Sequence, residues 1–183
     1  MPLFILVLVS FAAAYLAVMM GVLARRKPGY RHGLHTISEL GEVSAPDQRF
    51  VALGLFLPVG LALGLAAAFL MSRHEALAAL AGAVAAGYIL AALFPCDRGS
   101  PISGSARQAV HKAGGAMEYL GGGYALLNLA EVHGAPFSVA GVIVLIAAAL
   151  LTVLPAKSLR GLVQRLAETV LFLALLYGIL RLQ

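Results

Sequence analysis

Residues 51–72 read VALGLFLPVGLALGLAAAFLMS, an almost wholly apolar stretch without a charged side chain. About 20 mostly apolar residues are needed for one helix to cross the hydrocarbon core of a bilayer. The stretch therefore predicts a membrane-spanning helix, and five other segments share its character. We expect an all-α membrane bundle of six spans in a single domain, 1–183. The six predicted spans are 2–24, 51–72, 76–95, 113–133, 137–155 and 166–182.

The composition excludes an ordinary soluble domain. Of the 183 residues, 61% are hydrophobic and 11% are charged, and the mean hydropathy is +0.94. Soluble domains are about half apolar and about a quarter charged, so lipid must cover much of this surface. We expect a multi-pass protein of the cell membrane. The apolar run from the N-terminus to Ala24 has no basic region before it, which predicts an uncleaved first span and not a signal peptide.

The basic residues predict the orientation of the bundle. Cytoplasmic loops of membrane proteins carry an excess of Lys and Arg. With the N-terminus outside, eleven basic residues fall on the inner side and only Arg73 and Arg181 on the outer side. We therefore expect both termini outside and both long polar loops in the cytoplasm. The inner set comprises Arg25, Arg26, Lys27, Arg31, Arg49, Arg98, Arg107, Lys112, Lys157, Arg160 and Arg165.

Local patterns predict where helices begin and how they pack. Ser105 and Gln108 have the spacing of a capping box, in which Ser105 caps the fourth helix and Gln108 reaches back, so His111 already lies on that helix. Gly60 and Gly64 have GxxxG spacing, which permits close approach of a neighbouring helix. Such small-residue faces would also permit oligomers. The last span, 166–182, is short unless its helix begins earlier.

Glu118 is the most unusual residue by position, because it lies inside the fourth predicted span. An ionisable group in hydrocarbon is costly, so we expect it to face the bundle interior with a partner or a proton. Seven residues make almost two helical turns, which places His111 on the same face. The two lie about 10 Å apart along the axis. They therefore predict two layers, with His111 at the mouth and Glu118 deeper.

The first long loop adds polar residues that our topology places on the same side as Asp97 and His111. A metal-activated water needs three nitrogen or oxygen ligands and a nearby base. A divalent metal such as zinc could take His35, Asp97 and His111 as ligands, with Glu39 or Glu118 as the base. The candidate polar site comprises His35, Ser38, Glu39, Asp97, His111 and Glu118.

Plainer structural roles compete with this site. Thr36 and Glu39 also have the spacing of a capping box for a short helix. Asp97 could satisfy backbone amides after the preceding span or pair with Arg98 or Arg107. His111 could be an interfacial hydrogen-bonding residue.

Other ionisable residues are expected outside a site. Glu168 begins the predicted last span and should stay near the surface. Haem is not expected, because all five histidines lie at the ends of spans or in loops. Nucleotide and nucleic-acid binding are not expected either, since the chain lacks basic and aromatic repeats.

Two motifs resemble a known membrane family. The segment His35-Thr-Ile-Ser-Glu-Leu-Gly41, together with Phe94-Pro-Cys-Asp97 followed by Gly-Ser-Pro and by His111, resembles the bacterial and archaeal family called domain of unknown function 998. The resemblance covers nearly the whole chain and implies a six-helix membrane protein with no established reaction. The family also looks distantly similar to Frag/Sfk-type membrane proteins linked to lipid handling.

Three functions remain open on the sequence alone. The first is a lipid-interacting or structural membrane protein whose polar site holds the bundle together or binds a lipid headgroup. The second is a metal-dependent intramembrane hydrolase acting on a lipid-like substrate. The third is proton-coupled transport of a small solute through Glu118.

Overall fold

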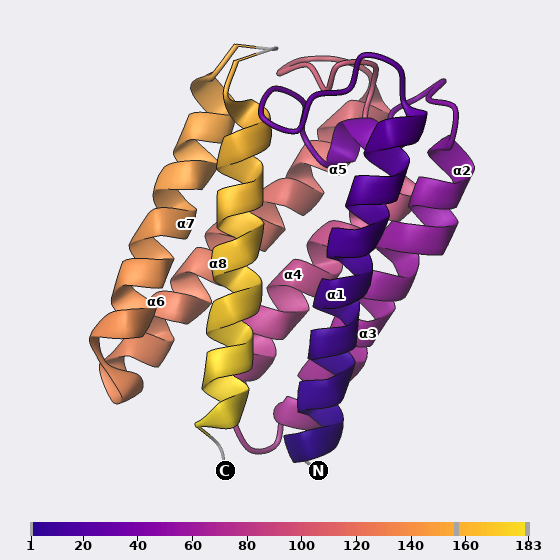
Figure 1. Ribbon diagram of the computed structural model, residues 1–183. Coiled ribbons are helices and arrows are strands. Elements are labelled where there is room, and N and C mark those ends of the chain that lie inside the picture. The colour runs from indigo at the N-terminus through magenta and orange to yellow at the C-terminus, as the bar shows by residue number, and fades with distance from the viewer. Residues whose placement is uncertain (1, 156–157, 182–183) are drawn as a thin grey trace.

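The computed structural model describes residues 2–155 and 158–181, which fold into helices and connecting loops without a strand (Figure 1). Long helices run roughly side by side in one bundle. Two short π-helical segments, η2 and η3, interrupt them, and η1 is a short 3-10 helix. The elements are α1 (Pro2–Arg26), η1 (Ser38–Gly41), α2 (Gln48–Phe50), η2 (Val51–Phe56), α3 (Leu57–Leu70), α4 (Glu75–Leu93), α5 (Ala106–Ala116), η3 (Met117–Gly121), α6 (Gly122–His133), α7 (Ala135–Val153) and α8 (Arg160–Leu180).

Five helical stretches are long and apolar enough to cross a membrane, and each overlaps one of the predicted spans. The remaining span, 113–133, lies within α5, η3 and α6, which follow one another without a break. The last helix begins at Arg160, so it is longer than the segment 166–182. The architecture is that of a membrane helical protein. The number of crossings and the sidedness of the termini stay predictions.

The two long polar loops meet at one end of the bundle. Helix α1 begins and α8 ends at the opposite end (Figure 1). The backbone N–H of Val43 donates to the carbonyl of Cys96 at 3.0 Å. The backbone N–H of Gly99 donates to Oε2 of Glu42 at 2.6 Å. The sequence expectation that these loops share a side is therefore confirmed, and the two loops also hold each other in place.

Helices α3 and α4 pack closely because glycine lies at their crossing. A Cβ atom on Gly60 would lie 3.0 Å from the backbone nitrogen of Ile89 and 3.2 Å from the carbonyl oxygen of Ala85. At Gly64 a Cβ would reach the side chain of Ala85 at 3.9 Å. The close approach predicted from the GxxxG spacing is thus present between these two helices.

Pro58 explains an irregular turn in the second long helix. Proline has no backbone N–H, so the carbonyl four residues earlier, that of Gly54, loses its ordinary helical donor. The hydroxyl of Tyr15 on α1 donates to this carbonyl at 2.6 Å. The surrounding residues, Val51–Phe56, form the π-helical segment η2. A side chain from another helix thus replaces the hydrogen bond that proline removes.

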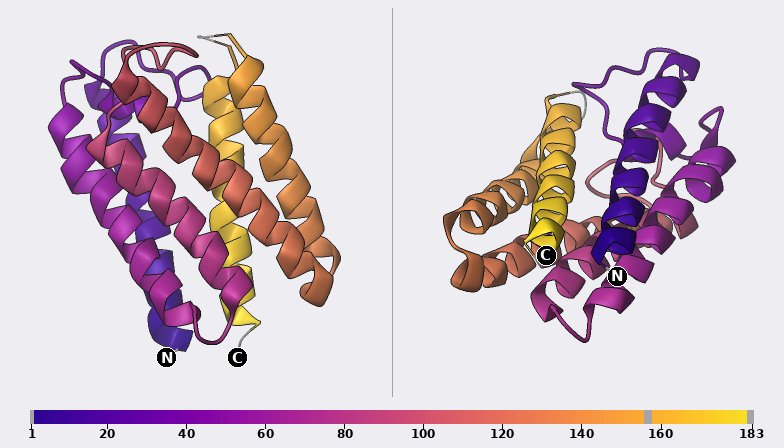
Figure 2. Two further views of the ribbon diagram at one scale, coloured as in Figure 1. Left: turned by 180° about the vertical axis from the view of Figure 1, so that it is seen from behind. Right: turned by 60° about the horizontal axis from the view of Figure 1, so that its bottom comes forward.

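Helices α6 and α7 form a V whose closed end lies away from the polar loops (Figure 2). Gly134 joins them with φ +83°, a left-handed conformation that favours glycine. Farther along, a Cβ on Gly141 would lie 3.0 Å from the carbonyl oxygen of Gly123, so the helices touch there. Beyond this point α5 lies against α4, while α7 stays beside α8. The V therefore opens toward the end that carries the polar loops.

Candidate functional site

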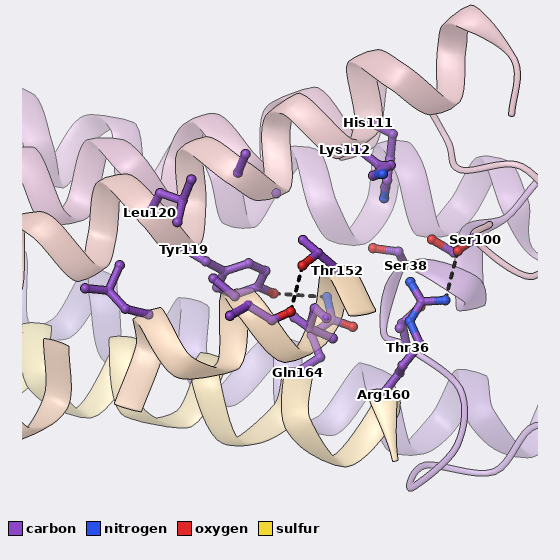
Figure 3. Close-up of a pocket in the computed structure, with 16 residues that line it drawn as sticks. Thr36, Ser38, Ser100, His111, Lys112, Tyr119, Leu120, Thr152, Arg160 and Gln164 are labelled. Carbon is purple, nitrogen blue, oxygen red and sulfur yellow. Dashed lines mark hydrogen bonds between the residues drawn. The ribbon is translucent and has the colours of Figure 1, made fainter. Parts of the chain in front are cut away.

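A pocket of about 390 Å³ fills the open part of the V. Its walls come from α5 and η3 on one side and from α7 and α8 on the other (Figure 3). Thr36 and Ser38 of the first long loop and Ser100 of the second cover its end. Two residues of the first long loop therefore cover this cavity, on the side of the bundle where the sequence places that loop. We call residues 30–41 the roof segment and this cavity the V pocket.

The covered end of the V pocket is polar and cationic. Arg160 on α8 is 8% exposed, and its Nη1 donates to the carbonyl of Ser100 at 3.0 Å. Its Nε is buried and has no hydrogen-bond partner among the described residues. The Lys112 side chain lies on the opposite wall, and Nζ donates to the carbonyl of Ile102 at 2.5 Å. The remaining polar residues of the lining are Thr36, Ser38, His111, Tyr119, Thr152 and Gln164.

The other end of the V pocket is apolar and open at the side. Leu120 of η3 and Leu145 of α7 line it, and Leu120 is 54% exposed. Gly115 leaves open space, because a Cβ there would meet nothing within 4 Å. The exposed flanks of these helices are the surfaces that lipid would cover in a membrane. The V pocket therefore opens on the lateral surface of the bundle, between η3 and α7.

His111 faces α4 and also lines the V pocket. Its Nδ1 lies 2.9 Å from the carbonyl oxygen of Phe94. A carbonyl only accepts hydrogen bonds, so Nδ1 carries a proton, and Nε2 of the neutral ring is then an acceptor. The hydrogen-bonding role that the sequence allowed for His111 is therefore present. The ring is anchored by α4 at the mouth of the polar region.

Glu118 occupies a second, smaller cavity deeper in the bundle. The residue is 6% exposed, and its Oε1 has no partner in the described part of the chain. A Cβ on Gly87 of α4 would collide with the Glu118 side chain, so glycine makes room for the carboxyl group. The cavity measures about 20 Å³. Glu118 thus faces the interior on the side toward α4, as does His111, and the two predicted layers are present.

Glu168 lies in the same inner cavity, and the expectation that it stays near the surface is wrong. It is 5% exposed, because α8 begins at Arg160, two turns earlier than position 168. The hydroxyl of Tyr119 donates to Oε1 at 2.7 Å, and that of Tyr88 donates to Oε2 at 2.9 Å. Gln164 donates from Nε2 to the Tyr119 hydroxyl at 3.1 Å. A hydrogen-bond chain therefore joins the inner cavity to the V pocket wall.

Asp97 organises the second long loop. Its Oδ2 accepts from the backbone N–H of Ser105 at 2.7 Å, and Oδ1 pairs with Arg107 at 2.6 Å. These donors, the Ser105 backbone first, lower the pKa of the Asp97 carboxyl. Ser105 caps α5 as predicted. The predicted return bond from Gln108 is absent, since Gln108 instead accepts from the Asp97 backbone and donates to Pro101.

Glu39 has the capping role that the sequence allowed. Its Oε1 accepts from the backbone N–H of Thr36 at 2.8 Å and from the Thr36 hydroxyl at 3.0 Å. The ammonium group of Lys27 donates to the Glu39 carbonyl and pairs with Glu42 at 2.7 Å. Glu39 therefore shapes the turn that presents Ser38 to the V pocket.

His35 lies in a different hollow from His111. Its Nδ1 accepts from the backbone N–H of Arg31 at 2.9 Å, and its ring stacks on Tyr30. The structure therefore does not bring His35, Asp97 and His111 together as one set of ligands. Within 2–155 and 158–181, no group of three His, Cys, Asp or Glu residues has the arrangement needed to hold a metal ion.

Arg165 fastens the roof segment to α8. Its Nη1 donates to the carbonyls of His32 and His35 at 2.5 and 3.0 Å, and its Nη2 donates to the Tyr30 hydroxyl at 2.6 Å. Tyr30 in turn donates to the carbonyl of Thr36 at 2.9 Å. Burial raises the pKa of Tyr30 to about 12, although Arg165 acts in the opposite direction. The phenol therefore stays a neutral donor.

Sequence reasoning missed the residues that α8 contributes. Arg160, Gln164 and Glu168 are spaced by four, which places them on one helical face. That spacing is visible in the sequence. However, Arg160 was used only as a basic residue that predicts the orientation of the bundle, and Glu168 was expected near the surface. The two buried tyrosines that bind Glu168 carry no comparable signal, because aromatic residues are common in apolar spans.

Comparison with known proteins places the chain in a family. The model of the family described as "Protein of unknown function (DUF998)" matches residues 8–181, so the chain belongs to this family. The match confirms the resemblance drawn from the two sequence motifs. No curated protein and no solved structure matches the chain.

Proposed function

We propose that this DUF998 protein binds an anionic amphiphile, a lipid with a phosphate or carboxylate headgroup, in the V pocket. The observation that carries the proposal is Arg160. Its guanidinium lies at the buried end of the pocket, and its Nε has no partner among residues 2–155 and 158–181, while the opposite end is apolar and opens sideways. The interaction with membrane lipids that we expect from the sequence is thus proposed to occur in the V pocket.

The charge at the covered end favours an anion. Buried charges are normally paired, since an isolated charge in a low-dielectric site is costly. The ion pairs of the described residues join Arg26 to Asp47, Lys27 to Glu42 and Arg107 to Asp97. Arg160 belongs to none of them, and a phosphate or carboxylate would supply its missing acceptor.

The apolar end favours a chain of hydrocarbon. Leu120, Leu145 and Leu151 line the pocket around the open space at Gly115. A pocket of about 390 Å³ lies in the range of known ligand sites, about 300 to 1,000 Å³. It would hold a headgroup and the first part of an acyl chain, and the rest of the chain would remain in the bilayer.

Hydrolysis is the weaker proposal for the same pocket. The neutral His111 ring would present an acceptor nitrogen beside Ser38, but the three ligands expected for a metal lie apart. Binding needs only the cation, the polar end and the apolar wall that the V pocket already combines. We therefore propose binding and assign no reaction.

Affinity measurements on purified protein test the proposal. Native mass spectrometry with added phosphatidylglycerol or phosphatidylcholine should show preferential binding of the anionic lipid. Arg160→Gln should weaken phosphatidylglycerol binding about tenfold or more, because hydrogen bonds to charged groups contribute about 1.5–3 kcal/mol. Arg73→Gln, which changes an exposed arginine at the other end of the bundle, is the matched control and should bind normally.

A second variant blocks the pocket without touching its charge. Gly115→Leu places a side chain in open space and should reduce binding of both lipids, whereas Gly21→Leu on α1, where a Cβ also meets nothing, should not. Inorganic phosphate should compete only weakly, since it lacks the acyl chain. Equal affinity of the Arg160→Gln variant and the unchanged protein for phosphatidylglycerol would contradict the proposal.

A further inference from the structure

We propose that Glu118 and Glu168 together form a proton-binding site inside the bundle, and that Tyr119 and Gln164 link it to the V pocket. The proton site stands on the geometry of the inner cavity alone. Its linkage to a ligand rests on the proposed function, because it requires that an anionic lipid occupies the V pocket.

The inner cavity holds two carboxyl groups in a space too small for a hydrated ion. Glu118 and Glu168 are 6% and 5% exposed, and both line the same cavity of about 20 Å³. Oε1 of Glu118 has no partner among the described residues. Both oxygens of Glu168 already accept from tyrosine hydroxyls. The carboxyl oxygen in this cavity that can still accept a hydrogen bond is therefore Oε1 of Glu118.

In the part of the chain that the structure describes, the groups around the pair supply hydrogen bonds but no ion pair. Tyr88 faces it from α4 and Tyr119 from η3, while η2 and the roof segment contribute the uncharged Phe56, Ile37 and Ser38. The nearest cation on α8, Arg165, donates to the roof carbonyls and to Tyr30. His111 lies on the Glu118 face, toward the loops, and bonds to Phe94.

A proton is the counter-charge that fits this arrangement. Two bare carboxylates in one dry cavity repel each other and lose their hydration, and ionisable groups within membrane spans mark proton sites for that reason. A proton needs no cavity volume of its own. Shared between Oε1 of Glu118 and the neighbouring carboxyl, it would satisfy the fully buried carboxyl oxygen that lacks a donor among the described residues.

The hydrogen-bond chain gives the V pocket a way to act on this site. Gln164 and Tyr119 both line the V pocket. The Tyr119 hydroxyl donates to Glu168, and Gln164 donates to the Tyr119 hydroxyl. A ligand oxygen that accepts from the Tyr119 hydroxyl would draw a donor away from the Glu168 carboxylate, and one that accepts from Gln164 would remove the donor that holds the Tyr119 hydroxyl. The negative charge of the headgroup would also favour protonation of the carboxyl pair. An anionic lipid should therefore bind with uptake of a proton, which passes from the buffer to the carboxyl pair.

Infrared spectroscopy tests the proton site without any ligand. The purified protein at neutral pH should show the C=O stretch of a protonated carboxyl group, and Glu118→Gln should remove it. Glu131→Gln is the matched control, because Glu131 is exposed on α6 and the chemical change is the same. Absence of the band from the unchanged protein, or its persistence in the Glu118→Gln variant, would overturn the proton site.

Calorimetry tests the linkage. Titrating short-chain phosphatidylglycerol in two buffers of different ionisation enthalpy measures the protons exchanged for each lipid bound. At the pH where the infrared band has half its full intensity, we expect uptake approaching half a proton in the unchanged protein and in the Glu131→Gln variant, and none in the Glu118→Gln variant. Lipid binding without proton uptake, or equal uptake in all three proteins, would overturn the linkage. Failure of the lipid to bind would refute the proposed function instead and leave the infrared result to decide the proton site.

Discussion

Pro58 leaves one backbone carbonyl without its helical donor, and a side chain of another helix supplies that hydrogen bond. Its missing N–H frees the Gly54 carbonyl, and the Tyr15 hydroxyl donates to that carbonyl at 2.6 Å. In a bilayer no water is present to replace such a bond, so each freed backbone group needs a donor from the protein. This hydrogen bond therefore ties α1 to the second long helix.

Removing the Tyr15 hydroxyl should destabilise the bundle in a way that depends on Pro58. Tyr15→Phe should cost about 1 kcal/mol, the usual net value of one hydrogen bond. Pro58→Ala supplies a backbone N–H for the Gly54 carbonyl, so Tyr15→Phe should cost much less in that background. Thermal unfolding of the four proteins in detergent measures the coupling. Equal costs in both backgrounds would show that the hydroxyl does not replace the helical donor.

Asp97 should make stability depend on pH at the acid side. Its pKa is lowered in the folded protein, chiefly by the Ser105 backbone N–H. A carboxyl group with a lowered folded pKa stabilises the fold above its unfolded value, about 3.9, and this contribution is lost as pH falls through the folded value. Asp97→Asn should therefore lower the unfolding temperature at pH 6, and the difference from the unchanged protein should shrink below about pH 4. A difference that is constant across this range would contradict the assignment.

At the scale of elements, the roof segment is held by contacts with α8, which is distant in sequence, so no local sequence pattern predicts them. Arg165 of α8 binds three groups of the roof, and the backbone N–H of Ile37 donates to Oε1 of Gln164 at 2.6 Å. The first and second loops also bond to each other. The elements that cover the V pocket therefore depend on α8 and on both loops at once.

Cys96 reports whether the roof is closed. Its thiol is buried under the first loop, where Sγ lies 3.4 Å from the Ser38 carbonyl, and burial raises its pKa to about 12. The native protein should react slowly with maleimide, and Arg165→Gln should speed labelling by loosening the roof. Arg25→Gln, at an exposed position on α1, should leave the rate unchanged. Rapid labelling of the unchanged protein would mean that the loops do not cover this site.

Local chemistry accounts for what the sequence predicted at this scale and for what it missed. Helix ends follow from nearby residues, so the Ser105 cap and the turn at Glu39 were predictable. The amide of Gln108 was misassigned because its partners in the second loop meet it only after the chain folds. Glu168 was misassigned because the predicted last span began too late, at 166, which left position 168 at a helix end.

At the scale of the whole molecule, the V that α6 and α7 form could not be predicted from hydropathy. Apolar length shows that a segment can cross a membrane, but it does not show how two neighbouring helices diverge. The close contact at Gly123 and Gly141 and the turn at Gly134 set the closed end of the V. The packing of α5 on α4 sets the open end. The pocket arises from these contacts together, so its lining includes residues that sequence reasoning left out.

Photo-crosslinking within the membrane tests the central claim most directly, namely that the V pocket holds an anionic lipid. A photoreactive amino acid replaces Leu145, which lines the pocket, or Ile146, which is 55% exposed on the outer side of α7. The crosslinked lipids are then identified by mass spectrometry. Anionic lipids should be enriched over their share of the bilayer at position 145 and not at position 146, and Arg160→Gln should abolish the enrichment. The same lipid composition at both positions would contradict the account.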